Sequence, residues 1–236
     1  MENPLVEVWS REQGAPREAM SVRRVVEMAL HIADAEGLDA LSMRRIAADL
    51  RSGTTSLYRY VASRDELIDL MLDAAYGAEP LPELTGDWRT DLAAMARRLR
   101  TAALRHPWIA GAMTTRPAFG PNALKQIDAS LAAATSLTSD ITVASNIVTA
   151  IGRYTLGAVA SELAELEARR RTGLSQDQWR ATVAPYIRQV IKGGAYPHFA
   201  RRVIEADDLS AEAEFEFGLA CLLDGIAART GATTQN

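Results

Sequence analysis

The sequence is poor in cysteine and contains no long hydrophobic run, and both shortages exclude classes of protein. The single cysteine among 236 residues, Cys221, excludes a disulfide framework and a cysteine-based zinc cluster. It falls between Leu219 and Leu222 on an apolar stretch, so we expect a small core residue there. No apolar run approaches the roughly 18 residues of a membrane-spanning helix. Residues 1–20 also lack the apolar centre of a signal peptide. We therefore expect a cytoplasmic protein without a membrane partner.

Signatures of catalysis are missing as well. The three histidines, His31, His106 and His198, lie far apart and form no H-E-x-x-H motif, and no glycine-rich phosphate loop is present. We predict that the protein is not an enzyme and that it holds no metal and no cofactor. Its net charge of −4 argues against a protein that binds nucleic acid over its whole surface. A basic face for nucleic acid would have to be a local one.

What remains is the composition of a compact globular protein, with 48% hydrophobic and 24% charged residues. Apolar residues recur at helical spacing and no convincing alternating pattern indicates a strand, so we predict an all-α fold. Residues 1–20 show no period and are expected to form a flexible arm. The stretch 77–86, rich in Gly and Pro, is the predicted boundary between a domain at 21–76 and a larger one at 87–230.

The smaller domain is expected to contain short helices with recognisable ends. Ser21 and Gly37 bound the first helix, and Ser42 caps the second. A third helix is predicted over about residues 54–61. The run Ser63-Arg64-Asp65-Glu66 is a capping box, in which the Ser hydroxyl and the Glu carboxylate each bind a backbone amide, and it opens a fourth helix.

Residues 42–61 predict two helices joined by a short turn at Gly53, which is the arrangement of a helix-turn-helix. Between residues 44 and 64, five Arg and one Asp give a local charge of 5 − 1 = +4. The third helix carries hydroxyl, Arg and Tyr side chains around Leu57 and Val61, which we place in the core. Small hydroxyls and Arg can bind phosphates or base edges. A short Arg-rich helix is also compatible with a solvated face, so spacing alone leaves DNA binding open.

The runs LDALSMRRIAADL and TTSLYRYVASRDELIDLML, within residues 38–72, resemble the DNA-binding domain of the TetR family of transcriptional repressors. Residues 56–61 match the family's S/T-L-Y-x-H/Y-V recognition helix, and residues 63–67 match the start of its next helix. One departure is Arg51-Ser52, where the family usually has Gly and an aliphatic residue. The resemblance implies groove contacts from Thr54, Thr55, Ser56, Arg59 and Tyr60, phosphate contacts from Tyr58 and Arg64, and further contacts from Ser42 and Arg44.

The larger domain continues the helical pattern. The longest helix is predicted over about residues 141–170, a second capping box starts at Ser175, and Ser210 caps a terminal helix. Pro185 is expected to kink or split the helix that contains it. The helix after Gly120-Pro121 is expected to turn one apolar face inward, formed by Leu124, Ile127, Leu131 and Ala134.

Residues 87–230 also resemble the C-terminal domain of the tetracycline-repressor class of the same family. Four runs carry the likeness: Leu-Arg-His-Pro-Trp at 104–108, Thr-Arg-Pro at 115–117, Tyr-Thr-Leu-Gly at 154–157 and Phe-Glu-Phe-Gly-Leu at 215–219. The resemblance implies a homodimer formed by the long helix and the last helix, with an inducer held between the others. The helices at 141–170 and 210–229 are apolar on more than one side, which suits such an interface.

The resemblance does not extend to the metal ligands of that class. The class binds a drug-chelated magnesium ion through a His before Thr-Arg-Pro and a Glu after Thr-Leu-Gly. The matching positions here are Ala112 and Ser161, with Glu162 one residue away. We therefore expect an apolar or aromatic inducer without a metal ion. Taken singly, each candidate lining residue is better explained by ordinary core packing than by ligand contact. The candidates are Met95, Leu99, Trp108, Met113, Thr115, Arg116, Phe119 and Tyr154.

Together these features predict a homodimeric, ligand-responsive repressor that binds a palindromic operator in double-stranded DNA and is released by a small-molecule inducer. The alternative is an all-helical small-molecule carrier or drug-binding scaffold that does not bind DNA.

Overall fold

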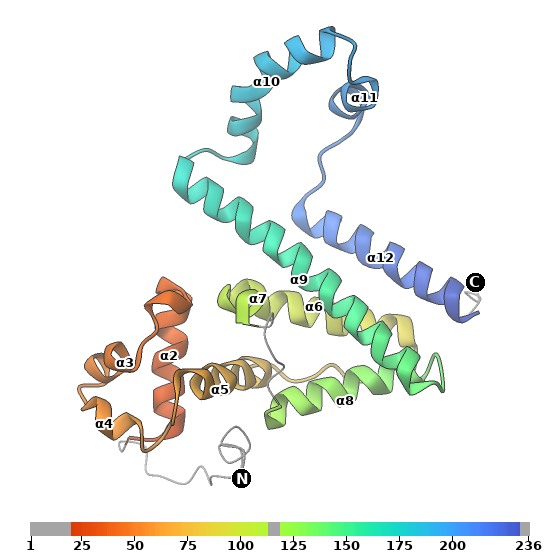
Figure 1. The fold of residues 1–236 in the computed structure, drawn as a ribbon. Helices are drawn as coiled ribbons and strands as arrows, with labels where there is room; N and C mark the ends of the chain where they lie inside the picture. The colour runs from red at the N-terminus through yellow and green to blue at the C-terminus, as the bar shows by residue number, and fades with distance from the viewer. Residues whose placement is uncertain (1–19, 113–118, 232–236) are drawn as a thin grey trace.

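The computed structural model describes residues 20–112 and 119–231, and every regular element in these ranges is a helix (Figure 1). The all-α prediction is therefore confirmed. Almost all of the predicted N-terminal arm, and the candidate residues Met113, Thr115 and Arg116, lie outside the described residues. Within those ranges no helix is both long and apolar enough to cross a membrane.

The N-terminal head is a small helical domain with its own core. Ser21 caps its first helix by accepting a hydrogen bond from the Arg24 N–H, and Gly37 follows the last turn. Leu57 and Val61 are fully buried, as predicted. The head consists of α2 (Val22–Glu36), η1 (Leu38–Ala40), α3 (Met43–Asp49), α4 (Thr54–Leu57) and the first turns of α5 (Arg64–Gly77).

Two local predictions for the head were wrong in detail. The third helix ends at Leu57 rather than near residue 61, because the Tyr60 N–H binds the Leu57 carbonyl three residues back and tightens the chain into a turn. The capping box at Ser63 is only half formed. The Ser63 hydroxyl accepts the Glu66 N–H, but the Glu66 carboxylate accepts the N–H of Ala62, one residue earlier than expected.

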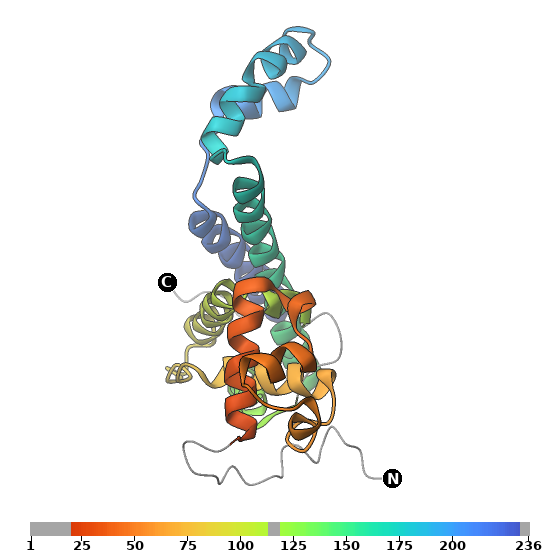
Figure 2. The same ribbon diagram turned by 90° about the vertical axis from the view of Figure 1, so that its left-hand side faces the viewer.

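The larger, C-terminal domain is built around two long helices, α6 (Trp88–Arg105) and α9 (Ile141–Thr172). α6 packs against α7, α8 and α9, and α12 packs along α9 (Figure 1). α10 and α11 stand away from the head, at the opposite end of the molecule (Figure 2), and neither contains a buried residue. The elements are α6 (Trp88–Arg105), α7 (Trp108–Ala112), α8 (Pro121–Thr135), α9 (Ile141–Thr172), α10 (Gln176–Lys192), α11 (Pro197–Glu205) and α12 (Ala211–Thr230).

The structure corrects several expectations for this domain. Of the kink or split expected at Pro185, the split does not occur, because α10 runs through this residue as one helix. α7 and α11 had no counterpart in the predicted helices. Cys221 is exposed rather than buried, because α12 turns its other side to α9. α8 is a helix as predicted, but it buries its small residues and turns Leu124 and Ile127 outward. The buried positions of α8 are Ala123, Ser130, Ala133 and Ala134.

Candidate functional site

The predicted DNA-contacting residues lie on adjoining pieces of the head: α3 and its cap, α4, the turn after α4, and the first residue of α5. Ser42 is the cap of α3, and its hydroxyl accepts the Arg45 N–H at 3.2 Å. Tyr58 follows α4 with half of its surface exposed. The structure brings all nine residues into this region. Ser42, Arg44, Thr55, Tyr58, Arg59 and Arg64 are exposed, and Thr54, Ser56 and Tyr60 are partly buried.

The turn between α3 and α4 has an unusual residue at its centre. Arg51 adopts a positive φ of 51°, in the left-handed region that favours glycine. Hydrogen bonds from the N–H groups of Arg51 and Ser52 to the carbonyls of Ala48 and Ala47 close the turn. The Arg at this position therefore gives the same turn geometry as a glycine, at the cost of backbone strain.

The arginines of the head differ in their surroundings. Arg45 pairs with Glu36 and Asp49, at 2.8 Å in each case, and its hydrogen bond to Asp49 raises its pKa. Arg64 donates to the carbonyls of Leu38 and Leu41 at 2.8 and 3.2 Å. In the part of the chain that the structure describes, Arg44, Arg51 and Arg59 take part in no ion pair. The positive charge of this face therefore comes from those three side chains and from Arg64, whose carbonyl partners supply no counter-charge.

The head meets the C-terminal domain at Asp34, on the last turn of α2. Its Oδ1 accepts the indole N–H of Trp108 at 2.7 Å and lies 2.8 Å from Nδ1 of His106. The rings of His106 and Trp108 lie 5.8 Å apart. Trp108 is also buried in a core cluster that includes the apolar residues of the head. Sequence reasoning did not single out Asp34, because its partners lie more than 70 residues away along the chain.

The other candidate ligand residues fall in separate places. Met95 is buried on α6 beside Gln126 of α8, with 3.8 Å between its sulfur and the amide nitrogen, and Leu99 lies one turn further along α6. Tyr154 stacks on Phe215 and donates its hydroxyl to the Phe215 carbonyl at 2.7 Å. Phe119, just before α8, is 59% exposed. The structure does not gather these side chains around one described cavity.

A hollow of about 250 Å³ does lie between α6 and α12. Its lining includes Arg97 and Glu216, which form a two-point ion pair at 2.7 Å, over an apolar floor that includes Leu219. Among the predicted ligand residues that the structure describes, none lines this hollow.

The positions that correspond to metal ligands do not form a metal site. Ala112 is buried, and the Ser161 hydroxyl donates to the Gly157 carbonyl of its own helix. Glu162 accepts two hydrogen bonds from Arg100, at 2.8 and 2.9 Å, and both side chains are largely buried. This hydrogen bonding raises the pKa of Arg100. Across the described residues, no group of three or more His, Cys, Asp or Glu is placed to hold an ion.

Residues 79–230 match the family described as "Tetracyclin repressor-like, C-terminal domain". The chain belongs to the TetR family of transcriptional regulators. The HTH-type transcriptional repressor DrrR1 of Streptomyces coeruleorubidus is 41% identical to it over 222 residues, which cover 92% of this chain and 80% of DrrR1. The class A tetracycline repressor from transposon 1721 of Escherichia coli is 28% identical over 210 residues, with 87% and 89% of the two chains covered.

Solved structures of TetR-family proteins share this fold. ActR of Streptomyces coelicolor in complex with actinorhodin superimposes with a TM-score of 0.75 and 29% identity, over 92% of this chain and all of ActR. The TetR-family protein described here is accordingly a ligand-responsive transcriptional repressor with a helix-turn-helix, and it is not an enzyme.

Proposed function

We propose that this repressor binds a palindromic operator as a homodimer, with α3, α4 and the following turn of each protomer at the DNA. The observation that carries this proposal is the exposed set on the head, where Arg44 and Arg59 have no acidic partner among the described residues. Cationic side chains without a local counter-charge are available to displace counterions from phosphates. Tyr58, half exposed beside them, offers a hydroxyl to the DNA backbone.

The homodimer would form through α9 and α12. Large apolar side chains on these helices are exposed in the single chain, which is unusual unless another surface covers them. Phe217 is 68% exposed on α12 and Ile141 is 59% exposed on α9. A two-fold axis through such an interface would present two heads to two half-sites of a palindrome.

The inducer would be an apolar aromatic molecule that binds without a metal ion. Support comes from Glu162, whose carboxylate is already engaged by Arg100, and from Ala112, which has no ligand atom. A relative of the same fold, ActR, has been solved with actinorhodin. The inducer would bind better to a conformation that holds the two heads wrongly spaced for DNA, and so would lower DNA affinity by population shift.

Selection of DNA from a random-sequence library tests the first proposal. We expect the wild-type protein to enrich a palindromic sequence and to bind it with a steep dependence on salt. Arg44→Ala should make the slope of log K against log salt shallower by about 1, the effect of losing one phosphate contact. Arg45→Ala is the matched control, because Arg45 is held by Glu36 and Asp49, and should leave the slope unchanged. Failure to enrich any sequence would favour a carrier without DNA binding.

A titration with actinorhodin and related aromatic polyketides tests the inducer. We expect release of the selected DNA, together with a change in tryptophan fluorescence, in the presence of excess EDTA. Release that disappears when EDTA is added would contradict binding without a metal. If none of these compounds releases the DNA, the assigned inducer class is wrong.

A further inference from the structure

A buried carboxylate joins α5, which starts in the head, to α8 of the regulatory domain. Asp73 on α5 is only 6% exposed. Its side chain accepts the backbone N–H groups of Asn122 and Ala123, each at 2.8 Å, and the side-chain amide of Asn122 at 3.0 Å. That amide also lies 3.2 Å from the Asp73 carbonyl oxygen. All four contacts cross between two helices that are about 50 residues apart in the sequence.

α8 has no cap of its own, and Asp73 supplies one. The N-cap residue is Gly120, which has no side chain, and the first helical residue is Pro121, which has no N–H. The first N–H groups that need a partner are therefore those of Asn122 and Ala123. Asp73 binds both, and its negative charge is also favoured by the dipole at the start of a helix. The start of α8 is thus completed by a residue of α5.

The two helices approach very closely beside this contact. Gly77 lies one turn after Asp73 on α5, and a Cβ atom at this position would come within 2.5 Å of the Asn122 side-chain nitrogen. Real Cβ atoms are not found at such distances from other heavy atoms, so a side chain at residue 77 would displace Asn122. The absence of a side chain at Gly77 therefore permits the contact between Asp73 and Asn122.

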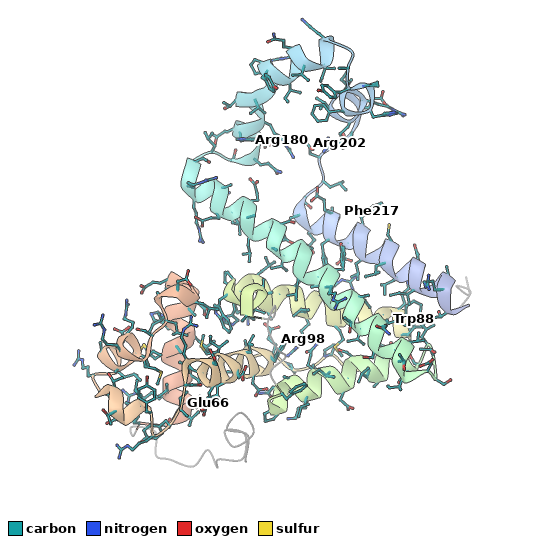
Figure 3. All side chains as sticks on the ribbon, viewed as in Figure 1. Glu66, Trp88, Arg98, Arg180, Arg202 and Phe217 are labelled. Atoms are coloured by element: carbon teal, nitrogen blue, oxygen red, sulfur yellow. The ribbon has the colours of Figure 1, made fainter. Side chains whose placement is uncertain are left out.

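A second set of hydrogen bonds fixes the end of α5. Arg98 of α6 lies where α5, α6 and α8 meet (Figure 3). Its guanidinium donates to the carbonyls of Tyr76, Glu79 and Pro80, at 2.7 Å for Glu79 and 3.3 Å for Pro80. It also donates to the Gln126 side chain on α8. The C-terminal end of α5 is consequently held by α6 and α8 together.

The opposite end of α5 belongs to the DNA-binding head. The Ser63 hydroxyl caps it by accepting the Glu66 N–H, and the Glu66 carboxylate accepts the N–H of Ala62, in the segment that follows α4. Leu67 and Met71 are fully buried in the head core. α5 is therefore a strut that is packed into the head at its start and bonded to α8 at its end. Pulling α8 away from α5 would strand a buried carboxylate and two N–H groups without partners, which is strongly unfavourable.

We propose that the contact of Asp73 with Asn122 and Ala123, made possible by Gly77, is the latch that couples the regulatory domain to the DNA-binding head. While these hydrogen bonds are formed, α5 moves together with the N-terminal end of α8. A shift of α8 therefore repositions α4 at the DNA. The inference rests on the proposed DNA binding of the head. It adds positioning residues, Asp73, Gly77 and Asn122, that touch neither DNA nor inducer.

Coupling between two sites is reciprocal, so the latch can be tested without an inducer. The probe is the DNA sequence that the wild-type protein enriches from a random library. Hydrogen exchange of the amides at residues 122–126 is measured in the full-length protein, free and bound to this DNA. In the wild type we expect DNA to change exchange at the start of α8 by roughly fivefold or more, the lower end of ordinary allosteric coupling.

Variants that open the latch should lose this response and still bind DNA. Asn122→Ala and Gly77→Ala both spare the backbone contacts to Asp73 and should reduce the response in part, whereas Asp73→Ala removes every side-chain acceptor and should abolish it. Trp108→Phe, at the other junction between the domains, is the matched control and should keep it. Circular dichroism checks the fold of each variant, and Asn122→Ala serves if Asp73→Ala does not fold.

The outcomes separate the two proposals. If the wild type enriches no DNA, the proposed function fails and the latch fails with it. If DNA binds but α8 exchange does not respond in the wild type, only the latch is overturned. The same conclusion holds if Gly77→Ala and Asn122→Ala respond as strongly as the wild type does.

Discussion

Asp34 of α2 accepts the indole N–H of Trp108 at 2.7 Å, and this hydrogen bond crosses the boundary between the head and the regulatory domain. Trp108 is 5% exposed and packs in the same core cluster as the head residues Ile32 and Met71. The two domains therefore share a hydrophobic core, and their relative position is set by this core together with the contacts of α5.

Trp108→Phe keeps an aromatic ring in this core but removes the N–H donor. We expect the free energy of unfolding to fall by about 1 kcal/mol, the usual contribution of one hydrogen bond. Urea denaturation followed by circular dichroism measures the change. Trp179→Phe is the control, because Trp179 is 54% exposed on α10 and its loss should cost less than about 0.5 kcal/mol. If the two substitutions lower the free energy of unfolding equally, the hydrogen bond of Trp108 does not contribute to stability.

Arg51→Gly should stabilise the head. Arg51 is held at a φ of 51°, and a left-handed conformation costs a residue with a Cβ roughly 1 kcal/mol relative to glycine. We expect a gain of about that size in urea denaturation. Arg44→Gly, inside α3, should have the opposite sign, because glycine destabilises a helix interior by about 1 kcal/mol. If Arg51→Gly is neutral or destabilising, the strain at this turn is relieved by contacts of the Arg51 side chain.

Phe217→Glu should dissociate the homodimer without unfolding the chain. Phe217 is exposed on α12 (Figure 3), so the substitution introduces a charge that only a partner chain would bury. Leu223 on the same helix is 3% exposed in the chain's own core and would report on folding instead. Light scattering should show a monomer mass for Phe217→Glu and a dimer mass for Leu84→Glu, an exposed site in the linker. A dimer that survives Phe217→Glu would place the interface elsewhere.

Asp91 should make the stability of the linker depend on pH. It is 3% exposed and accepts hydrogen bonds from the Thr85 N–H and hydroxyl, both at 2.8 Å, and from the Gly86 N–H at 3.1 Å. The backbone hydrogen bond of Thr85, foremost among these contacts, holds the pKa of Asp91 below its ordinary value of 3.8. Because the pKa is lower in the folded state, this stabilisation is complete above the unfolded value and is lost as pH falls through the folded one.

The Asp91→Asn variant should therefore melt at a lower temperature than the wild type at neutral pH. This difference in melting temperature, called the gap below, should narrow as the pH falls below about 4. Thermal unfolding at a series of pH values measures it. Asp207→Asn, at an exposed site before α12, should show no comparable gap at neutral pH. A gap for Asp91→Asn that stays constant into acid would assign the effect to packing rather than to charge.

The helices could be predicted from the sequence because their signals are local. Ser21, Ser42 and Ser210 each bind an N–H three residues ahead, and the hydroxyl and that amide lie within one turn of chain. Helical spacing also identified α8. It did not identify the buried side of α8, since Leu124 and Ile127 form an apolar face that the fold leaves exposed while Ser130 and its small neighbours pack inward.

The contacts between the domains could not be predicted in this way. Asp34 and Asp73 occur within helical segments, where an acidic residue normally indicates a solvated face. Their partners lie about 50 to 75 residues further along the chain, so nothing near them in the sequence marks their role. The residues predicted to contact DNA could be proposed from the sequence because they fall within one continuous motif at 42–64.

The ion pair of Arg100 and Glu162 also constrains how this protein can evolve. Arg100 lies 5.1 Å from the centre of the Phe215 ring, so a change that redirects Glu162 to a metal would leave a largely buried guanidinium without its counter-charge. Loss of Arg100 alone would strand Glu162 in the same way. Each single step passes through a less stable intermediate, and only paired mutations avoid it. Recognition of a metal-bound ligand through Glu162 should consequently arise less readily in this sequence than a change in the shape of the ligand site.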